Sequence, residues 1–164
     1  PEESIVSDES ATSSLIVTPH ALQAKPHDWL ALTGGSIGQG LPLAIGASIA
    51  KPDRPVITLH GDGGAMYTVQ ALWTQARENL NITNIIFSNR SYEILKIELD
   101  RVQAVETGER AASMFSMDNP PIDWVNLAES MGVQGYKPKT VKEFKDVFSK
   151  SVNESGPSLI EIEI

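Results

Sequence analysis

The chain has 164 residues, 41% of them hydrophobic, which predicts one soluble globular domain with a single core. Its formal net charge of −8 and isoelectric point near 4.8 argue against nucleic acid or an anionic membrane as a partner. The absence of cysteine excludes disulfides, thiolate metal sites and cysteine nucleophiles.

No apolar run approaches the length of about 18 residues that a membrane span requires, and no signal peptide is visible. A cytoplasmic location is therefore the default expectation. Because the chain begins with Pro1 rather than methionine, we expect a processed piece or a domain taken from a longer protein.

The N-terminal stretch combines a short strand with an ambiguous polar region. Residues 4–6 are a strand candidate, and residues 7–10 would form its polar end. Residues 11–25 predict a loop with a short helical piece, because prolines interrupt the pattern, although Ser13 could cap a helix. His20 is expected to be a surface or packed histidine rather than a catalyst.

A glycine-rich turn, residues 34–40, follows the next predicted strand, residues 29–33. Neither common nucleotide-binding pattern fits this turn. A Rossmann fingerprint would need glycine where Leu43 stands, and a Walker A loop would need lysine where Leu41 stands. What remains is a tight turn into a helix over residues 42–50, whose small residues permit close packing.

The most informative stretch runs from Gly61 to Tyr92. Residues 55–60 and 82–87 are apolar runs that predict buried strands. Between them, residues 68–80 predict a helix with five residues on one apolar face: Val69, Leu72, Trp73, Ala76 and Leu80. In a right-handed crossover, the turns after two parallel strands lie at the same edge of the sheet, where open α/β sheets bind ligands.

Those two turns carry a candidate metal site. Asp62 offers a carboxylate, Asn89 an amide oxygen, and the bend after Asn89 can turn a main-chain carbonyl inward. Hard oxygen ligands of low total charge suit Mg²⁺, which completes its shell with substrate phosphates. Gly63 and Gly64 have no side chains to keep phosphate oxygens from the backbone N–H groups. The alternative is an ordinary glycine turn that ends a strand, with Asn89 as a turn residue. His60 could touch a phosphate or line the rim, but we expect a packed histidine at the strand end.

The remaining chain predicts further alternation of helices and strands. We expect a helix over residues 92–99, an irregular excursion over 101–121, a helix over 124–131 capped by Asp123, a short strand over 132–136, a helix over 141–153 capped by Thr140, and a strand over 158–164 with one less buried face. A long excursion of this kind is often a lid or a partner contact. The whole pattern predicts an α/β fold with a doubly wound, mainly parallel sheet of about six strands.

The sequence Gly61-Asp62-Gly63, followed after twenty-four residues by Ser88-Asn89, resembles the thiamin-diphosphate motif. The intervening residues 65–74 are similar to benzoylformate decarboxylases and acetolactate-synthase-like large subunits, and the resemblance covers residues 5–164. Ser88 replaces the first Asn of the usual pair. The second Asn, which carries the metal in that family, is kept as Asn89.

The resemblance implies a role for several residues. Asp62, Asn89 and the main-chain oxygen of Ser91 would hold Mg²⁺. The carbonyl of Gly35 would accept the aminopyrimidine amino group, and Ile37 would force the bent cofactor conformation that brings the reacting atoms together; a core residue is the alternative for Ile37. The implied cofactor-binding set is Gly35, Ser36, Ile37, Asp62, Gly63, Gly64, Asn89, Ser91 and Tyr92, with Ser10, Thr12 and Ser13 as weaker candidates.

The resemblance also implies a substrate pocket lined by Ile94 and Leu95. Some decarboxylases of the superfamily carry a catalytic Glu at the position of Leu95, and this chain does not, so no acid or base is assigned. No role is assigned to His20, His27 or His60.

The activity implied by the resemblance is decarboxylation or carboligation of a 2-oxo acid, as a lyase or transferase, with chemistry carried by the cofactor. The Glu that protonates the aminopyrimidine lies, in that family, on a pyrimidine-binding domain of the neighbouring subunit. We expect residues 1–164 to form a single pyrophosphate-binding domain without the pyrimidine-binding and middle domains, and to assemble as a homo-oligomer, a dimer being the natural expectation. Alone, it would bind Mg²⁺ and the diphosphate weakly and turn over no 2-oxo acid. The alternatives are a non-catalytic regulatory or scaffold module with this fold, and a different phosphate-ligand α/β enzyme.

Overall fold

The computed structural model describes residues 1–102 and 108–164. Its elements, in chain order, are β1 (Ile5–Glu9), η1 (Ala11–Ser13), α1 (Ser14–Ala21), β2 (Asp28–Ala31), α2 (Gly40–Ala50), β3 (Val56–Gly61), α3 (Asp62–Ala65), α4 (Ala71–Arg77), β4 (Ile82–Ser88), α5 (Glu93–Arg101), α6 (Glu109–Ser113), α7 (Trp124–Ser130), β5 (Gln134–Tyr136), α8 (Val141–Asn153) and β6 (Ser158–Glu163). The strands form one parallel sheet in the order β2-β1-β3-β4-β6-β5, which confirms the predicted fold class. None of the described helices is both long enough and apolar enough to cross a membrane.

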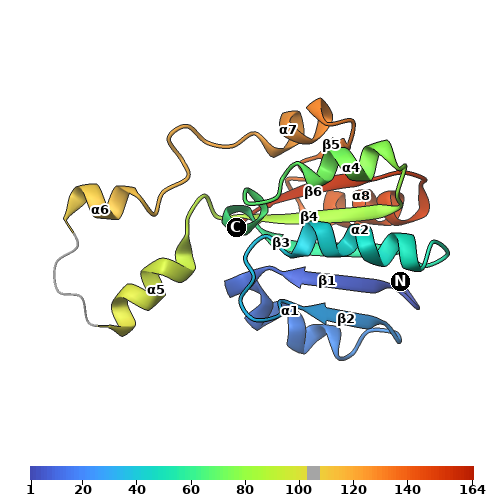
Figure 1. Ribbon diagram of the computed structural model, residues 1–164, viewed down its shortest axis with the longest axis horizontal. Helices are drawn as coiled ribbons and strands as arrows, with labels where there is room; N and C mark the ends of the chain where they lie inside the picture. Colours follow the sequence, from blue (N-terminus) through green and yellow to red (C-terminus); the bar gives the residue numbers. More distant parts are fainter. Residues whose placement is uncertain (103–107) are drawn as a thin grey trace.

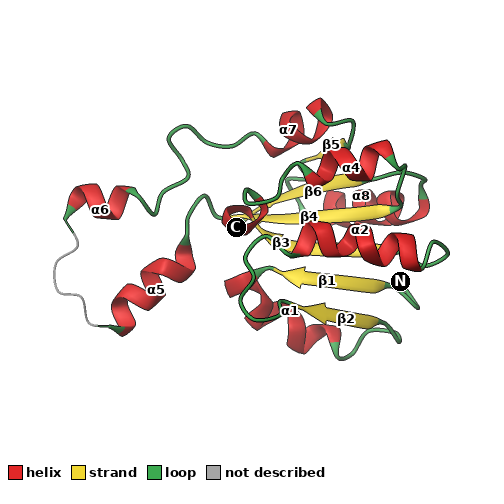
Figure 2. Ribbon diagram, viewed as in Figure 1, coloured by secondary structure: helices red, strands yellow, loops and turns green. Residues whose placement is uncertain are grey.

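Helices cover both faces of the sheet (Figure 1, Figure 2). Helices α2, α4 and α7 pack on one face, where Leu41, Leu72 and Trp124 are fully or almost fully buried against β4 and β6. Helices α1 and α8 pack on the other face, against alternate residues of β1, β3 and β4. Neighbouring residues such as Ile85 and Ile86 therefore belong to different cores, as expected for strands buried on both faces.

The order of the strands places a switch point between β1 and β3. From β1 the chain adds β2 on one side of the sheet, and from β3 it adds β4 and the later strands on the other. In open α/β sheets, ligands bind in the crevice outside the carboxyl ends of the strands at such a point. Here the crevice lies between the segment that follows β1 and the Gly61–Gly64 turn.

Strand β1 is longer than predicted. Residues 7–9, which we expected to form the polar end of the strand, continue it and are buried. Asp8 accepts hydrogen bonds from Ser10 and Ser14, and Ser7 donates to the carbonyl of Gly40. These local partners allow polar side chains inside a central strand.

The predicted helix over residues 68–80 is shorter than expected, because α4 covers only Ala71–Arg77. Trp73, predicted on the apolar face, is 53% exposed and lies 5.3 Å from the Arg77 guanidinium. A helix of two turns presents a narrow face to the sheet. This one buries Leu72, as predicted, together with Ala71 and Gln75, which were not on the predicted face.

The C-terminal strand was predicted to have one less buried face. The first four residues of β6 are all buried instead, because this strand lies between β4 and β5. Glu161 is 1% exposed and pairs with Lys137, with 3.0 Å between Oε2 and Nζ. The predicted caps are confirmed at two helices: Asp123 accepts from the backbone N–H of Asn126, and Thr140 accepts from that of Glu143.

The ambiguous region after β1 is more helical than expected, since η1 and α1 continue to Ala21 with Pro19 inside the helix. The side chain of Ser13 makes no cap hydrogen bond there. The predicted irregular excursion contains helix α6, and residues 103–107 of that prediction lie outside the described residues.

Helices α5 and α6 form an arm that extends away from the sheet (Figure 1). Among the described residues of these two helices, none is buried. The arm returns to the domain through residues 115–117, which pair with the loop after β4. Met117 donates its N–H to the carbonyl of Arg90 at 2.7 Å, and Tyr92 donates to the carbonyl of Phe115 at 2.9 Å.

Candidate functional site

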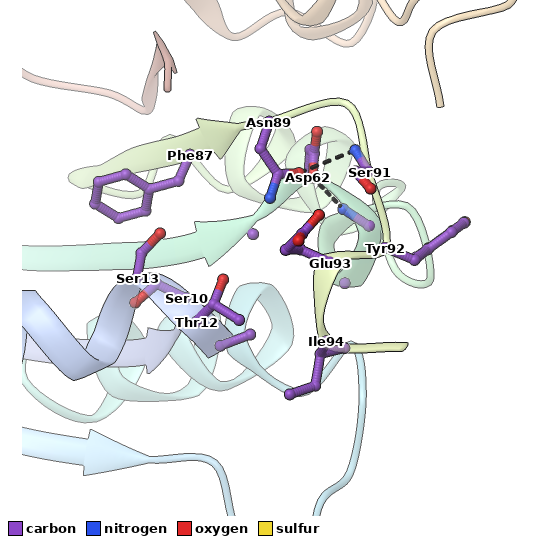
Figure 3. A pocket seen from close by; sticks show the side chains of 14 residues that line it. Ser10, Thr12, Ser13, Asp62, Phe87, Asn89, Ser91, Tyr92, Glu93 and Ile94 are labelled. Atoms are coloured by element: carbon purple, nitrogen blue, oxygen red, sulfur yellow. Dashed lines mark hydrogen bonds between the residues drawn. The ribbon is translucent and has the colours of Figure 1, made fainter. Parts of the chain in front are cut away.

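A cavity of about 60 Å³ lies at the switch point, at the carboxyl ends of β1, β3 and β4. It is lined by Ser10, Ala11, Thr12, Ser13, Gly61, Asp62, Gly63, Gly64, Phe87, Asn89, Ser91, Tyr92, Glu93 and Ile94. Figure 3 shows the side chains of Asp62 and Asn89 next to each other at this cavity. The two turns that were predicted to meet at one edge of the sheet do so.

Asp62 is the buried acid of the site, with 3% of the residue exposed. Its Oδ1 accepts the N–H of Gly63 at 2.8 Å, and its Oδ2 accepts the N–H of Arg90 at 2.7 Å. Burial raises the pKa of Asp62, and these N–H groups offset that rise only in part. A cation would therefore stabilise the ionised carboxylate more effectively than the N–H donors do alone.

Asn89 is oriented by its own loop. Its Oδ1 accepts the N–H of Ser91 at 2.9 Å, which closes a local Asx turn. The Ser91 hydroxyl donates to the carbonyl of Phe115 at 3.2 Å, so the returning end of the arm braces the same loop. Asn89 is thus a turn residue, as the alternative interpretation held, and its amide also borders the cavity.

The glycines of the acidic turn lie close to neighbouring side chains. A Cβ on Gly63 would lie 2.7 Å from two atoms of the Tyr92 ring. A Cβ on Gly64 would lie 3.1 Å from Glu9 Oε1 and 3.1 Å from His60 Cε1. The predicted reason for these glycines was access for phosphate oxygens; close contact with Tyr92, Glu9 and His60 is a second reason.

The charge of the site is low. Within the described residues, no group of three or more His, Cys, Asp or Glu side chains is placed to hold a metal ion. Asp62 is accompanied by the amide of Asn89 and by backbone groups; Glu93 also lines the cavity, but its carboxylate is paired with Lys96 at 3.0 Å. A donor set in which Asp62 is the one buried carboxylate fits Mg²⁺ whose remaining ligands are waters and phosphate oxygens.

Not all predicted residues line this cavity. Ile94 does, whereas Leu95, Gly35, Ser36 and Ile37 lie outside it. The turn that contains Gly35 is exposed. Within it, the carbonyl of Gly35 accepts the N–H of Ile37 at 2.9 Å. Ile37 is 57% exposed, so it is not a core residue of this domain.

Two histidines lie away from the cavity lining, and two lining residues were not predicted. His60 is fully buried, which confirms the packed histidine expected there, and the exposed His20 makes a contact with the carbonyl of Ile16. Phe87 and Glu93 line the cavity but were not predicted as site residues. Glu93 lies a few residues after Asn89, on the first turn of α5. The predicted helix over residues 92–99 could therefore have indicated that Glu93 lies near the site.

Comparisons with known proteins agree with this geometry. Residues 11–162 match the family model described as thiamine pyrophosphate enzyme, C-terminal TPP binding domain. A protein of Mycobacterium tuberculosis named as a candidate acetolactate synthase large subunit, IlvX, is 47% identical over 163 residues, which are 99% of this chain and 32% of that protein. The benzoylformate decarboxylase of Pseudomonas aeruginosa is 27% identical over 162 residues, 99% of this chain and 29% of that protein.

A solved structure gives the same result in three dimensions. The thiamine diphosphate-dependent 4-hydroxybenzoylformate decarboxylase of Rhodococcus jostii RHA1 has a TM-score of 0.84 and 32% sequence identity, and the match covers 99% of this chain and 30% of that one. The chain spans about a third of the length of these relatives. Since the family model covers the acidic turn, the loop after β4 and most of the sheet, we conclude that the chain belongs to the thiamine pyrophosphate enzymes, of which it is the C-terminal TPP-binding domain.

Proposed function

We propose that this domain binds Mg²⁺ and the diphosphate of thiamin diphosphate (thiamine pyrophosphate) as part of a 2-oxo-acid decarboxylase or acetolactate-synthase-like enzyme. The observation that carries the proposal is the meeting of Asp62 and Asn89 at one small cavity at the switch point of the sheet. The family membership supports the cofactor, and the donor set supports the metal.

In this proposal, Asp62, the amide oxygen of Asn89 and the main-chain oxygen of Ser91 hold the Mg²⁺ ion. The backbone at Gly63 and Gly64 receives phosphate oxygens, and the Tyr92 ring keeps the turn in place through its contact with Gly63. When bound, the cofactor supplies the electron sink for decarboxylation. The exposed turn at Gly35 and Ile37 presents a carbonyl and an apolar side chain to the rest of the cofactor.

The cavity is too small to enclose a whole cofactor. Pockets that bury ligands of drug size have volumes of about 300–1,000 Å³, whereas this cavity measures about 60 Å³. Ile94, which lines the cavity, is 44% exposed, and two large apolar side chains outside the lining are also exposed, Ile37 at 57% and Tyr67 at 61%. We infer that a pyrimidine-binding domain covers the cofactor from this side and supplies the catalytic Glu, and that two or more copies assemble to provide it.

The first test concerns turnover. We predict that the purified 164-residue chain, supplied with Mg²⁺ and thiamin diphosphate, releases no CO₂ from pyruvate or benzoylformate. The physical reason is that the Glu that protonates the aminopyrimidine is expected on the separate pyrimidine-binding domain, and the exposed turn at Gly35 to Ile37 would leave the cofactor open to water. Release of CO₂ at a rate above that of cofactor alone would contradict this prediction.

The second test concerns the metal site. Asp62→Ala removes the carboxylate of the site, and we predict that it weakens Mg²⁺-dependent binding of thiamin diphosphate by at least about tenfold, since loss of even a supporting residue of a metal site has effects of this size. Isothermal titration calorimetry measures the affinity. Asp146→Ala, which changes the same residue type on the exposed side of α8, is the matched control for net charge. Equal affinity in wild type and Asp62→Ala would remove the metal assignment.

A further inference from the structure

A buried carboxylate and a buried histidine lie directly behind the two turns of the proposed cofactor site. Glu9 and His60 are paired neighbours on the adjacent parallel strands β1 and β3. Their side chains are 4% and 0% exposed. The Nε2 atom of His60 lies 3.1 Å from Oε2 of Glu9, in a contact that lacks hydrogen-bond geometry and is therefore mainly electrostatic.

Glu9 holds the glycine-rich turn that precedes α2. Its Oε1 accepts the N–H of Gly38 at 2.5 Å, and its Oε2 accepts the N–H of Gly40 at 2.6 Å. Charged acceptors make short, strong hydrogen bonds with backbone N–H groups, and two such bonds fix both position and orientation. The carbonyl of Gly38 accepts a third bond, from Thr68 Oγ1 at 2.7 Å. The exposed residues Gly35 to Ile37 thus end on a firmly anchored glycine.

His60 joins the same carboxylate to the acidic turn. It stands two residues before Asp62, and its Nδ1 lies 3.1 Å from the carbonyl of Gly61. The turns also approach the pair too closely for side chains: a Cβ on Gly40 would lie 2.9 Å from the His60 ring, and a Cβ on Gly64 would lie 3.1 Å from both Glu9 and His60. Both glycine turns are therefore packed against one buried pair.

Burial by itself would raise the pKa of Glu9. The nearby His60 ring, together with the N–H groups of Gly38 and Gly40, outweighs that effect and lowers the pKa of Glu9 below its ordinary value. An ionised carboxylate is the form that accepts both N–H groups.

We propose that Glu9, supported by His60, is a positioning residue that sets the Gly35–Ile37 turn relative to the Asp62 turn. The inference rests on the proposed function, because these turns would receive opposite ends of the same cofactor. The carboxylate is the group that contacts both: the N–H groups of one turn and the histidine of the strand that leads into the other. Its role is to keep the distance between the diphosphate end and the aminopyrimidine end of the site constant.

Two ligands distinguish this role from a general contribution to stability. Pyrophosphate with Mg²⁺ occupies only the Asp62 end, whereas thiamin diphosphate with Mg²⁺ needs both ends. In Glu9→Gln the side-chain amide places a donor against a backbone N–H, so one of the two anchoring bonds is lost. We expect this variant to lose affinity for thiamin diphosphate by about tenfold or more, as expected for a hydrogen bond to a charged group. Its affinity for pyrophosphate should change by less than about twofold.

The measurement is an NMR titration of the ¹⁵N-labelled chain, which also reports weak binding. Amide hydrogen exchange at Gly38 and Gly40 gives a second readout that needs no ligand, and it should be faster in Glu9→Gln than in wild type. Glu161→Gln is the matched control, because Glu161 is a second buried carboxylate, 1% exposed and paired with Lys137. It should change neither the exchange at the two glycines nor the ratio of the two affinities.

The possible results separate a failure of the positioning role of Glu9 from a failure of the proposed function. Equal weakening of both ligands in Glu9→Gln, or the same selective loss in Glu161→Gln, would overturn the positioning role while the proposed function stands. If wild type binds neither ligand, the proposed function fails and the inference fails with it. Should Glu9→Gln not fold, His60→Gln keeps the carboxylate and removes its supporting ring. It should show the same selective loss to a smaller extent, and an unchanged affinity ratio in that variant would count against the proposal.

Discussion

At the scale of single residues, Asn84 shows how one polar side chain connects the core. It is fully buried in the middle of β4. Its Oδ1 accepts from Thr58 Oγ1 at 3.0 Å and from Gln75 Nε2 at 3.2 Å, and its Nδ2 donates to Gln75 Oε1 at 2.7 Å and to the carbonyl of Ser158 at 2.9 Å. An amide offers two donors and two acceptor positions, so Asn84 is completely satisfied. Its bonds join β3, β4, β6 and α4 into one unit.

We predict that Asn84→Leu lowers the free energy of unfolding by about 3 kcal/mol or more, because buried polar groups of Thr58, Gln75 and Ser158 lose their partner. Urea denaturation followed by circular dichroism measures the change. Asn126→Leu, on the exposed side of α7, is the control and should cost less than about 1 kcal/mol. Similar values for the two variants would show that the buried network contributes nothing specific.

At the scale of elements, charged side chains tie the loop after β4 to the end of β6. Glu163, near the C-terminus of β6, pairs with Lys137 at 2.9 Å, with Lys139 at 3.2 Å and with Arg90 at 2.5 Å. Arg90 also donates its backbone N–H to Asp62, so this network adjoins the proposed metal site. Lys137 and Lys139, followed by Arg90, lower the pKa of Glu163 from the ordinary value of 4.5 to about 2.

The sign of the pH dependence follows from that lowered pKa. The folded state favours the ionised carboxylate, so Glu163 contributes stability above about pH 4.5, and this contribution is lost as the pH falls toward about 2. We predict that Glu163→Gln reduces the difference in unfolding free energy between pH 7 and pH 3, measured by urea denaturation. The effect should be small and should weaken in high salt, because the side chains are partly exposed.

Glu129→Gln, which removes an exposed carboxylate on α7, is the control for the general effect of charge. If it narrows the pH dependence as much as Glu163→Gln does, the ion pairs at the end of β6 are not the cause.

At the scale of the whole molecule, the sheet with its covering helices and the arm of α5 and α6 differ in their packing. The sheet is covered on both faces, whereas the described residues of α5 and α6 include none that is buried. Helices without tertiary packing are marginal in water at this length. The arm is held to the rest of the domain at its two ends, by the loop after β4 and by residues 115–117.

We predict that trypsin cleaves the chain first after Arg101 or Arg110, because cleavage requires local unfolding and the arm has the least packing to lose. Mass spectrometry of a time course identifies the first fragments. The lysines of α8 serve as the internal comparison: they are also exposed, but their helix is packed on the sheet through Phe144 and Phe148. First cleavage within α8 would contradict the prediction.

Strand positions could be predicted from the sequence more accurately than the burial of single side chains. Strands such as residues 82–87 were predicted nearly to their bounds, because a parallel strand buried on both faces is mostly apolar, although Thr83 and Asn84 interrupt the apolar residues here. Trp73 was placed on the wrong side because the length of α4 depends on the turns before it, which periodicity does not show. Residues 7–9 were predicted to end a strand because they are polar, and only their partners on α1 and α2 make their burial possible.

For the candidate site, the sequence by itself determined the two turns, the order of strand and helix that carries Asp62 and Asn89 to one edge, and the resemblance that the family match confirms. Only the tertiary structure decided that Glu9 and His60 stand side by side behind both turns, because the pairing of β1 with β3 joins residues far apart in the chain. Contacts within one turn follow from local spacing, whereas contacts across the sheet depend on strand order and register, which local spacing leaves open.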